Sequence, residues 1–217
     1  EKEQNLYQVL NKADENMYQD KLTKSKSAKN NLVKGLINTL EAKSHETKEH
    51  ALRMKRLSRA LGEEIDLSDS ELNDLSLLST LHDIGKSTIA KEILTKPENL
   101  KKEEWEEIKK HPQYGYRIAS ATEEFASVAE EILCHHEKWD GSGYPQGLKG
   151  EEIPLLSRII AIVDAYDVMI QGRPYQQPIS QKEALAELRR SAGSHFDPRL
   201  VEKFEKIIKE QIAIGEK

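Results

Sequence analysis

The histidines and aspartates of this chain follow one another in an order that could bind metal ions. The candidates are His50, the pair His82-Asp83, His111, the pair His135-His136, and Asp164. Imidazole and carboxylate groups suit divalent cations such as iron, manganese, nickel and zinc, and the absence of cysteine ligands argues against a purely structural zinc site. The single cysteine, Cys134, is expected to fill the core beside Ile132. The set therefore predicts a catalytic metal centre.

The number of candidate ligands indicates more than one ion. Seven side chains exceed what one four- to six-coordinate ion accepts while keeping positions open for water and substrate. Adjacent residues on a helix point about 100° apart, so we expect each of the two pairs to face two neighbouring ions. Glu46 precedes His50 by four residues, which on a helix places both on one face and makes a third ion possible.

A lone histidine is more often a hydrogen-bonded packing residue than a ligand. We therefore expect His45 and His195, which stand apart from the ordered series, to pack rather than bind. Arg53 is expected to pair with a nearby acid, and so to orient a ligating carboxylate from outside the metal shell.

Helices must position these side chains, because helix signals recur along most of the sequence. The signals are capping boxes at Ser68 and Glu71 and at Ser180 and Glu183, a cap and first-turn pair at Asp197 and Pro198, and stop glycines at Gly85 and Gly193. An apolar run after Pro154 lacks two-residue alternation and predicts a central core helix. Residues 140–154 hold four glycines and two prolines and predict a shaped loop.

Apolar residues at spacings of three and four, such as Leu6, Leu10, Ala13 and Met17 and then Leu32, Leu36 and Leu40, predict long amphipathic helices over residues 1–60. The polar stretch from Thr23 to Asn31 is either a linker or an exposed part of one continuous helix, and the sequence leaves both open. Such helices could form a homodimer or could pack on their own domain.

The composition restricts the kind of partner. Charged residues make up 33% and hydrophobic residues 37% of the 217 residues, as in a soluble globular protein, and the net charge of −5 gives no footprint for DNA binding. No apolar stretch approaches the roughly 20 residues that cross a bilayer, and no signal peptide opens the sequence, so we expect a cytoplasmic protein. A phosphate ligand would need local cations, which metal ions could supply.

Several motifs together resemble the HD-GYP family. They are HxxR at 50–53, LHDIGK at 81–86, the run from His135 to Asp167 with its Gly143-Tyr144-Pro145 triplet, RPY at 173–175 and HFDPRLV at 195–201. The resemblance covers about residues 46–205. It implies an all-α HD-superfamily helical bundle with a glycine-rich GYP loop. It also implies a metal-dependent phosphodiesterase that hydrolyses cyclic di-GMP to linear pGpG, and in some members on to GMP.

The resemblance assigns roles residue by residue. The implied metal ligands are Glu46, His50, His82, Asp83, His111, His135, His136 and Asp164, for two or three divalent ions, iron or manganese before nickel or zinc. Asp83 would bridge two ions and Lys86 would stabilise charge in the transition state. Lys86, Tyr144, Arg173 and Gln176 would contact substrate; Gln176 departs from the family, which often carries lysine or arginine there, and this puts substrate preference in doubt.

A second, short resemblance covers Ala13 to Lys21, which is similar to the last helix of a GGDEF domain. It divides the chain into a helical remnant and connector, residues 1–43, and an HD-GYP domain, residues 44–217. The full-length protein would then carry an upstream GGDEF or sensor domain.

Two other functions compete. Other HD-superfamily enzymes hydrolyse nucleotides with the same core, but the GYP loop argues against them. A catalytically silent module that binds a cyclic dinucleotide is a second alternative, and the intact ligand positions argue against it. The sequence leaves the metal, the preferred dinucleotide and the end product open.

Overall fold

The structure is a computed structural model that describes residues 35, 38–39, 42–43, 47–96, 98–172 and 177–215. Within these ranges the chain is helical, as expected, and an isolated bridge between Ala192 and Phe196 is the only β pairing. The α-helices are α2 (Lys48–Glu64), α3 (Asp69–Leu81), α4 (Lys91–Leu94), α5 (Lys102–Ile108), α6 (His111–Ser120), α7 (Ala129–Cys134), α8 (Leu155–Gln171), α9 (Gln181–Arg190) and α10 (Pro198–Gly215), with short 3-10 turns η1 (Ile84–Thr88), η2 (Ala126–Val128) and η3 (Gly150–Glu152). No helix among them is long and apolar enough to span a membrane.

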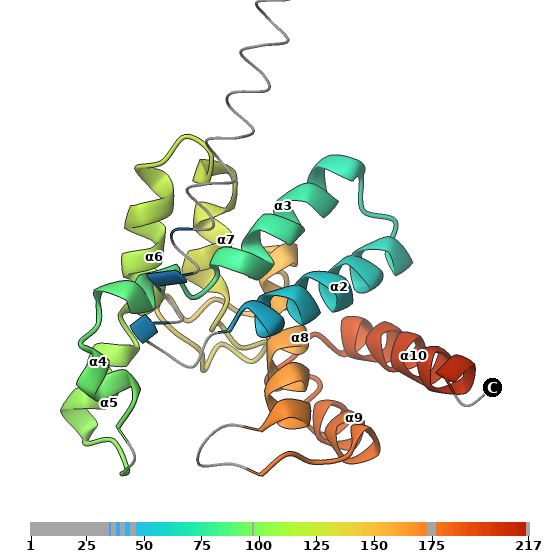
Figure 1. Cartoon of the computed structure of the whole chain (residues 1–217). Coiled ribbons are helices and arrows are strands. Elements are labelled where there is room, and N and C mark those ends of the chain that lie inside the picture. The colour runs from blue at the N-terminus through green and yellow to red at the C-terminus, as the bar shows by residue number, and fades with distance from the viewer. Residues whose placement is uncertain are drawn as a thin grey trace, which may run out of the picture.

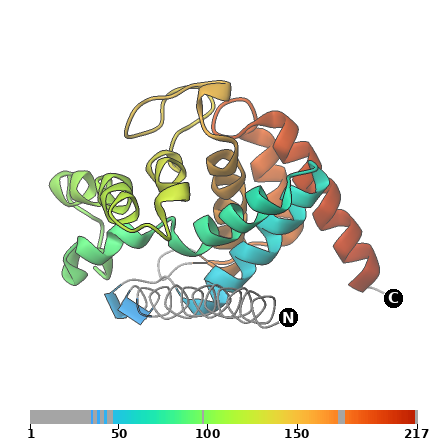
Figure 2. The ribbon, with the colours of Figure 1, turned by 90° about the horizontal axis from the view of Figure 1, so that it is seen from above.

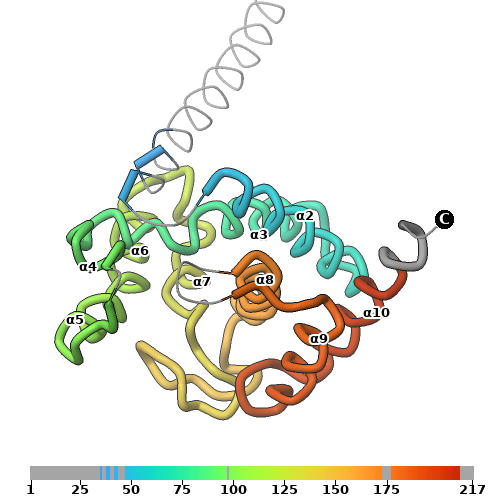
Figure 3. Tube along the Cα trace, turned by 60° about the horizontal axis from the view of Figure 1, so that its bottom comes forward, coloured from blue at the N-terminus to red at the C-terminus, as the bar shows by residue number. Residues whose placement is uncertain are grey.

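Helix α8 is the centre of the domain. It contacts α2, α3, α7, α9 and α10, and Figure 3 shows these helices arranged around it. Its Ile159, Ile160, Ile162 and Val163 are fully buried, which confirms the predicted core helix after Pro154. Figures 1 and 2 show α4, α5 and α6 on one side of α8, and α9 and α10 on the other.

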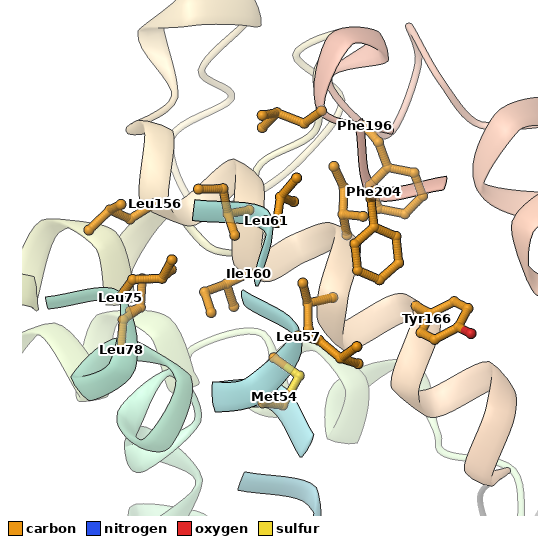
Figure 4. Packing of buried hydrophobic residues seen from close by; sticks show 14 of the residues in the cluster. Met54, Leu57, Leu61, Leu75, Leu78, Leu156, Ile160, Tyr166, Phe196 and Phe204 are labelled. Atoms are coloured by element: carbon orange, nitrogen blue, oxygen red, sulfur yellow. The ribbon is translucent and has the colours of Figure 1, made fainter. Parts of the chain in front are cut away.

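The hairpin of α2 and α3 lies across α8 and supplies much of the core. Figure 4 shows Met54, Leu57 and Leu61 of α2 beside Leu75 and Leu78 of α3, all buried. Each such side chain contributes roughly 1.5 to 3 kcal/mol by leaving water. This packing fixes the ends of both helices, where candidate ligands lie.

Most predicted helix boundaries are confirmed. Ser68 with Glu71 and Ser180 with Glu183 form complete capping boxes before α3 and α9. Gly85 is different, because α3 ends at Leu81 and Gly85 lies inside η1. A Cβ at Gly85 would lie 1.9 Å from the carbonyl oxygen of His111, so this glycine permits the close approach of α6 rather than ending a helix.

The glycine-rich segment 140–154 is irregular, as predicted, apart from the single turn η3. Gly141, Gly147 and Gly150 have φ of 84°, 71° and 59°, a region that favours glycine. The side chains of Arg158 and Arg199 lie over the ring of Trp139 at the base of this loop, at 5.9 and 6.0 Å from its centroid. The loop is therefore attached to α8 and α10.

The division at residues 43 and 44 stays a prediction. Residues 1–43 lie almost entirely outside the described residues, so the choice between a linker and a continuous helix at Thr23 to Asn31 and the resemblance to a GGDEF helix stay untested. The possible homodimer through these helices is untested as well.

Candidate metal centre

Four of the candidate ligands form a first cluster. One donor atom from each of Asp83, His111, His135 and His136 lies within 4.8 Å of the others. Asp83 follows α3 by two residues, His111 is the first residue of α6, and His135 caps the C-terminus of α7. The cluster thus forms where three helices end or begin.

In the first cluster, the lone pairs of neighbouring donor atoms face one another at short range. The Nδ1 atoms of His111 and His135 lie 2.8 and 2.6 Å from the backbone oxygens of Ile108 and Ile132, so these nitrogens donate their protons there. The Nε2 atoms are then acceptors, yet they lie 3.2 Å apart, and Nε2 of His111 is 3.0 Å from Oδ1 of Asp83. Three acceptors this close repel one another unless a cation lies between them, so the donor set fits a metal ion.

Two histidines of this cluster, His135 and His136, are held neutral. Burial, followed by the neighbouring imidazoles, lowers the pKa of His135 and of His136 well below the usual value. A neutral imidazole offers the lone pair that a metal ion requires.

The remaining three described candidates, His50, His82 and Asp164, form a second cluster within the same 4.8 Å limit. Nε2 of His50 lies 3.7 Å from Oδ1 of Asp164. This oxygen is buried and accepts no hydrogen bond from the described part of the chain, which leaves its lone pairs available to a cation.

Asp83 lies between the two clusters. Its Oδ1 faces His111, while its Oδ2 lies 3.4 Å from Nε2 of His82 and 2.5 Å from Nζ of Lys86. Although burial alone would raise the pKa of Asp83, the ammonium group of Lys86, followed by His82, holds it well below the usual value. The carboxylate is therefore ionised, and its two oxygens lie near histidines of both clusters.

The pairs of adjacent residues behave differently from one another. His82 and Asp83 enter different clusters, as predicted, but His135 and His136 enter the same one. Both pairs lie beyond regular helix, because α3 ends at Leu81 and α7 ends at Cys134, so the 100° spacing of helical neighbours applies to neither pair. The number of ions that each pair faces stays a prediction. The rings of His135 and His136 lie 4.1 Å apart.

Outside the clusters, Asp167 orients His50. Its Oδ2 lies 2.7 Å from Nδ1 of His50, and Arg53 donates to both of its oxygens at 2.6 and 2.9 Å. Burial alone would raise the pKa of Asp167, but the bonds from His50 and Arg53 lower it. Arg53 thus pairs with an acid, as expected, but the acid supports a histidine ligand instead of binding metal itself. Sequence reasoning missed Asp167, although its spacing of three from Asp164 was a usable signal.

Tyr144 lies beside the first cluster. Its ring stacks on that of His136 with centroids 5.0 Å apart. Burial and then the charge of Asp83 raise the pKa of Tyr144, so its hydroxyl stays protonated.

Three predicted site residues, Glu46, Arg173 and Gln176, lie outside the described residues. Helix α2 begins at Lys48 with Thr47 as its N-cap, and the relation of Glu46 to His50 stays a prediction. His45 also lies outside the described residues.

His195 enters neither cluster, as expected, and its ring stacks on Phe196 at 4.6 Å. It does line a cavity of about 190 Å³ together with His135, His136 and Asp164. Cys134 is buried, as predicted, and its thiol donates to Gln146 at 3.4 Å.

Comparisons with known proteins agree with this geometry. The family model described as "HD domain" matches residues 34–200. A cyclic di-GMP phosphodiesterase of Thermotoga maritima is 41% identical over 172 residues, covering 78% of this chain and 47% of that protein. The 3'3'-cGAMP-specific phosphodiesterase 2 of Vibrio cholerae is also 41% identical, over 79% of this chain and 33% of the relative.

Among solved structures, a cyclic GMP-AMP specific phosphodiesterase of V. cholerae superposes with a TM-score of 0.64 at 27% identity, over 82% of this chain and 48% of that one. The chain thus spans between a third and a half of the length of these relatives. The extent of the family match, the shared helical fold and the GYP triplet lead to one assignment. The chain belongs to the HD domain family and, within it, to the HD-GYP group.

Proposed function

We propose that this chain is a metal-dependent phosphodiesterase that hydrolyses cyclic di-GMP to linear pGpG, and in a further step to GMP. The observation that carries the proposal is the pair of adjacent His/Asp clusters, with Asp83 of the first lying 3.4 Å from His82 of the second. Cyclic di-GMP phosphodiesterases among the relatives support the substrate.

The ligands would be the seven clustered residues, with Glu46 as an eighth for a third ion. When bound, the ions would supply Lewis acidity and a nucleophile near neutral pH. Iron and manganese fit a set of imidazoles and carboxylates without thiolate, and nickel and zinc accept the same donors. The two oxygens of Asp83 would hold the two sites in a fixed relation.

The other residues act on substrate charge. Lys86 places an ammonium group at the edge of the clusters, where it can stabilise charge that grows on the phosphoryl oxygens. Tyr144, with its protonated hydroxyl, can donate to the phosphate or stack on a guanine. Arg173 would bind phosphate in a bidentate contact and Gln176 would border it. Arg173→Ala should raise KM roughly 10- to 100-fold without loss of metal.

A second substrate has a specific observation in its favour. Several relatives are 3'3'-cGAMP-specific phosphodiesterases, and Gln176 replaces the basic residue common in the family. Cyclic GMP-AMP is therefore the second candidate, and Gln176→Lys should tighten cyclic di-GMP binding if this residue sets the preference.

The test is anaerobic purification with metal analysis, followed by chromatography of products from cyclic di-GMP and cyclic GMP-AMP. We expect two or three ions per chain and turnover of cyclic di-GMP. A fully metallated protein that cleaves neither dinucleotide would refute the proposal, and one that cleaves only cyclic GMP-AMP would transfer it to the second substrate.

A further inference from the structure

Glu137 follows His135 and His136 directly but belongs to neither cluster. Glu137 is only 3% exposed, which is unusual for a glutamate that forms no ion pair with the described residues. Its carboxylate accepts three backbone N–H groups of the glycine-rich loop. Oε1 accepts from Gln146 at 2.6 Å and from Gly147 at 3.1 Å, and Oε2 accepts from Leu148 at 3.1 Å.

The first part of the same loop, at Gly143 and Tyr144, packs against the backbone around Glu137. The N–H of Tyr144 donates to the carbonyl oxygen of His136 at 3.2 Å. A Cβ added at Gly143 would lie 2.5 Å from the Cα of Glu137 and 2.3 Å from the nitrogen of Lys138. The loop therefore closes tightly around the residue that follows the two histidines.

We propose that Glu137 is a positioning residue: its carboxylate fixes the glycine-rich loop so that Tyr144 stays on His136 and faces the substrate. The inference rests on the proposed function. It makes substrate binding depend on the position of the glycine-rich loop, which Glu137 fixes. Glu137 contacts no reacting group; it acts through Tyr144.

The chemistry requires a carboxylate at this position. Three N–H groups converge on the side chain, and an ionised carboxylate is an acceptor at both oxygens. In Glu137→Gln the shape is retained, but the NH₂ group must face an N–H donor of the loop, so at least one bond is lost and one repulsion is added. This isosteric change therefore tests the anchoring with little change in packing.

The same loop offers a matched control. Glu152 also accepts a backbone N–H, from Lys149 at 2.9 Å, but it is exposed and belongs to neither cluster. Glu152→Gln changes the same atoms in the same loop without touching the contact with Tyr144.

The experiment compares both variants with the metallated wild-type protein by steady-state kinetics on cyclic di-GMP, metal analysis and amide hydrogen exchange over residues 141–150. For Glu137→Gln we expect KM to rise roughly 10-fold with kcat changed by less than about 3-fold. Exchange at Gln146, Gly147 and Leu148 should accelerate about 10-fold, with metal content unchanged. Glu152→Gln should leave KM and the exchange at these three amides unchanged.

Unchanged KM and exchange in Glu137→Gln would overturn the inference. So would loss of metal with an equal fall in kcat and kcat/KM, because Glu137 would then support the histidines rather than the loop. If Glu137→Gln does not fold, Glu137→Asp replaces it, because aspartate keeps the charge but is shorter by one methylene. KM and amide exchange should then change in the same direction as expected for Glu137→Gln. Wild-type values of both in Glu137→Asp would overturn the inference. If the wild-type protein does not cleave cyclic di-GMP, the proposed function fails, while the exchange measurement still decides whether Glu137 anchors the loop.

Discussion

Gly85→Ala should disturb the metal centre through the backbone. The added Cβ would lie 1.9 Å from the carbonyl oxygen of His111 and 2.6 Å from the nitrogen of Gly115, whereas real Cβ atoms essentially never approach closer than 3.0 Å. Moving from 1.9 to 3.0 Å requires the start of α6 to shift by about 1 Å, since both contacted atoms are backbone and cannot rotate away. His111, the first residue of α6, must move with it.

A displacement of that size exceeds the roughly 0.2 Å within which metal–ligand distances normally vary. We expect Gly85→Ala to lose about one ion per chain from the first cluster. Overpacking of this kind costs about 1 to 3 kcal/mol. Because 1 kcal/mol shifts Tm by roughly 2 to 4 °C in a domain of this size, Tm should fall by about 2 to 12 °C.

The assay is metal analysis together with thermal unfolding followed by circular dichroism. Gly115→Ala is the matched control: it lies in the same contact, but its Cβ would meet a side-chain atom, Cγ2 of Ile132 at 2.7 Å, and would lie 3.4 Å from the backbone nitrogen of Gly85. This control should keep its full metal content. A Gly85→Ala protein with wild-type metal content and Tm would refute the account of the contact between η1 and α6.

Three further predictions concern single side chains. Asp83→Ala should abolish hydrolysis while the far-ultraviolet circular dichroism stays helical, because the carboxylate that lies between the two clusters is lost; normal turnover would contradict the mechanism. Asp167→Asn should weaken metal binding in the second cluster about 10- to 100-fold in competition with a chelator, and the same affinity as wild type would exclude a role in orienting His50. Burial raises the pKa of Cys134 to about 12, so at pH 8 the native thiol should react with iodoacetamide roughly 1000-fold more slowly than in the unfolded chain. The stability that this neutral thiol contributes is present below about pH 9 and is lost as the pH rises towards 12.

The sequence was informative where local chemistry decides the structure. The capping boxes at Ser68 and Ser180 specified helix starts because both partners lie within four residues. The order of histidines and aspartates predicted a site for more than one ion, since their number alone exceeds one coordination shell.

What the sequence could not supply depends on contacts between distant segments. Which ligands share a cluster follows from how the helices pack, since His111 of α6 and the pair after α7 meet Asp83 beyond the end of α3. Gly85 was interpreted as a helix stop because nothing local shows that α6 packs on it. The role of Glu137 is equally hidden, since its partners are backbone groups nine to eleven residues away.

The two clusters draw their donors from α2, the ends of α3 and α7, the start of α6, and the middle of α8. Any ion bound there acts as a crosslink between segments that lie far apart in the chain, and it can exist only in the folded state. Its binding free energy therefore adds to that of folding, by about 1.4 kcal/mol for each tenfold rise in free metal above the dissociation constant. The supply of metal would then affect the stability of the fold as well as the proposed hydrolysis. Without metal, the chain should unfold more often and become more accessible to proteases.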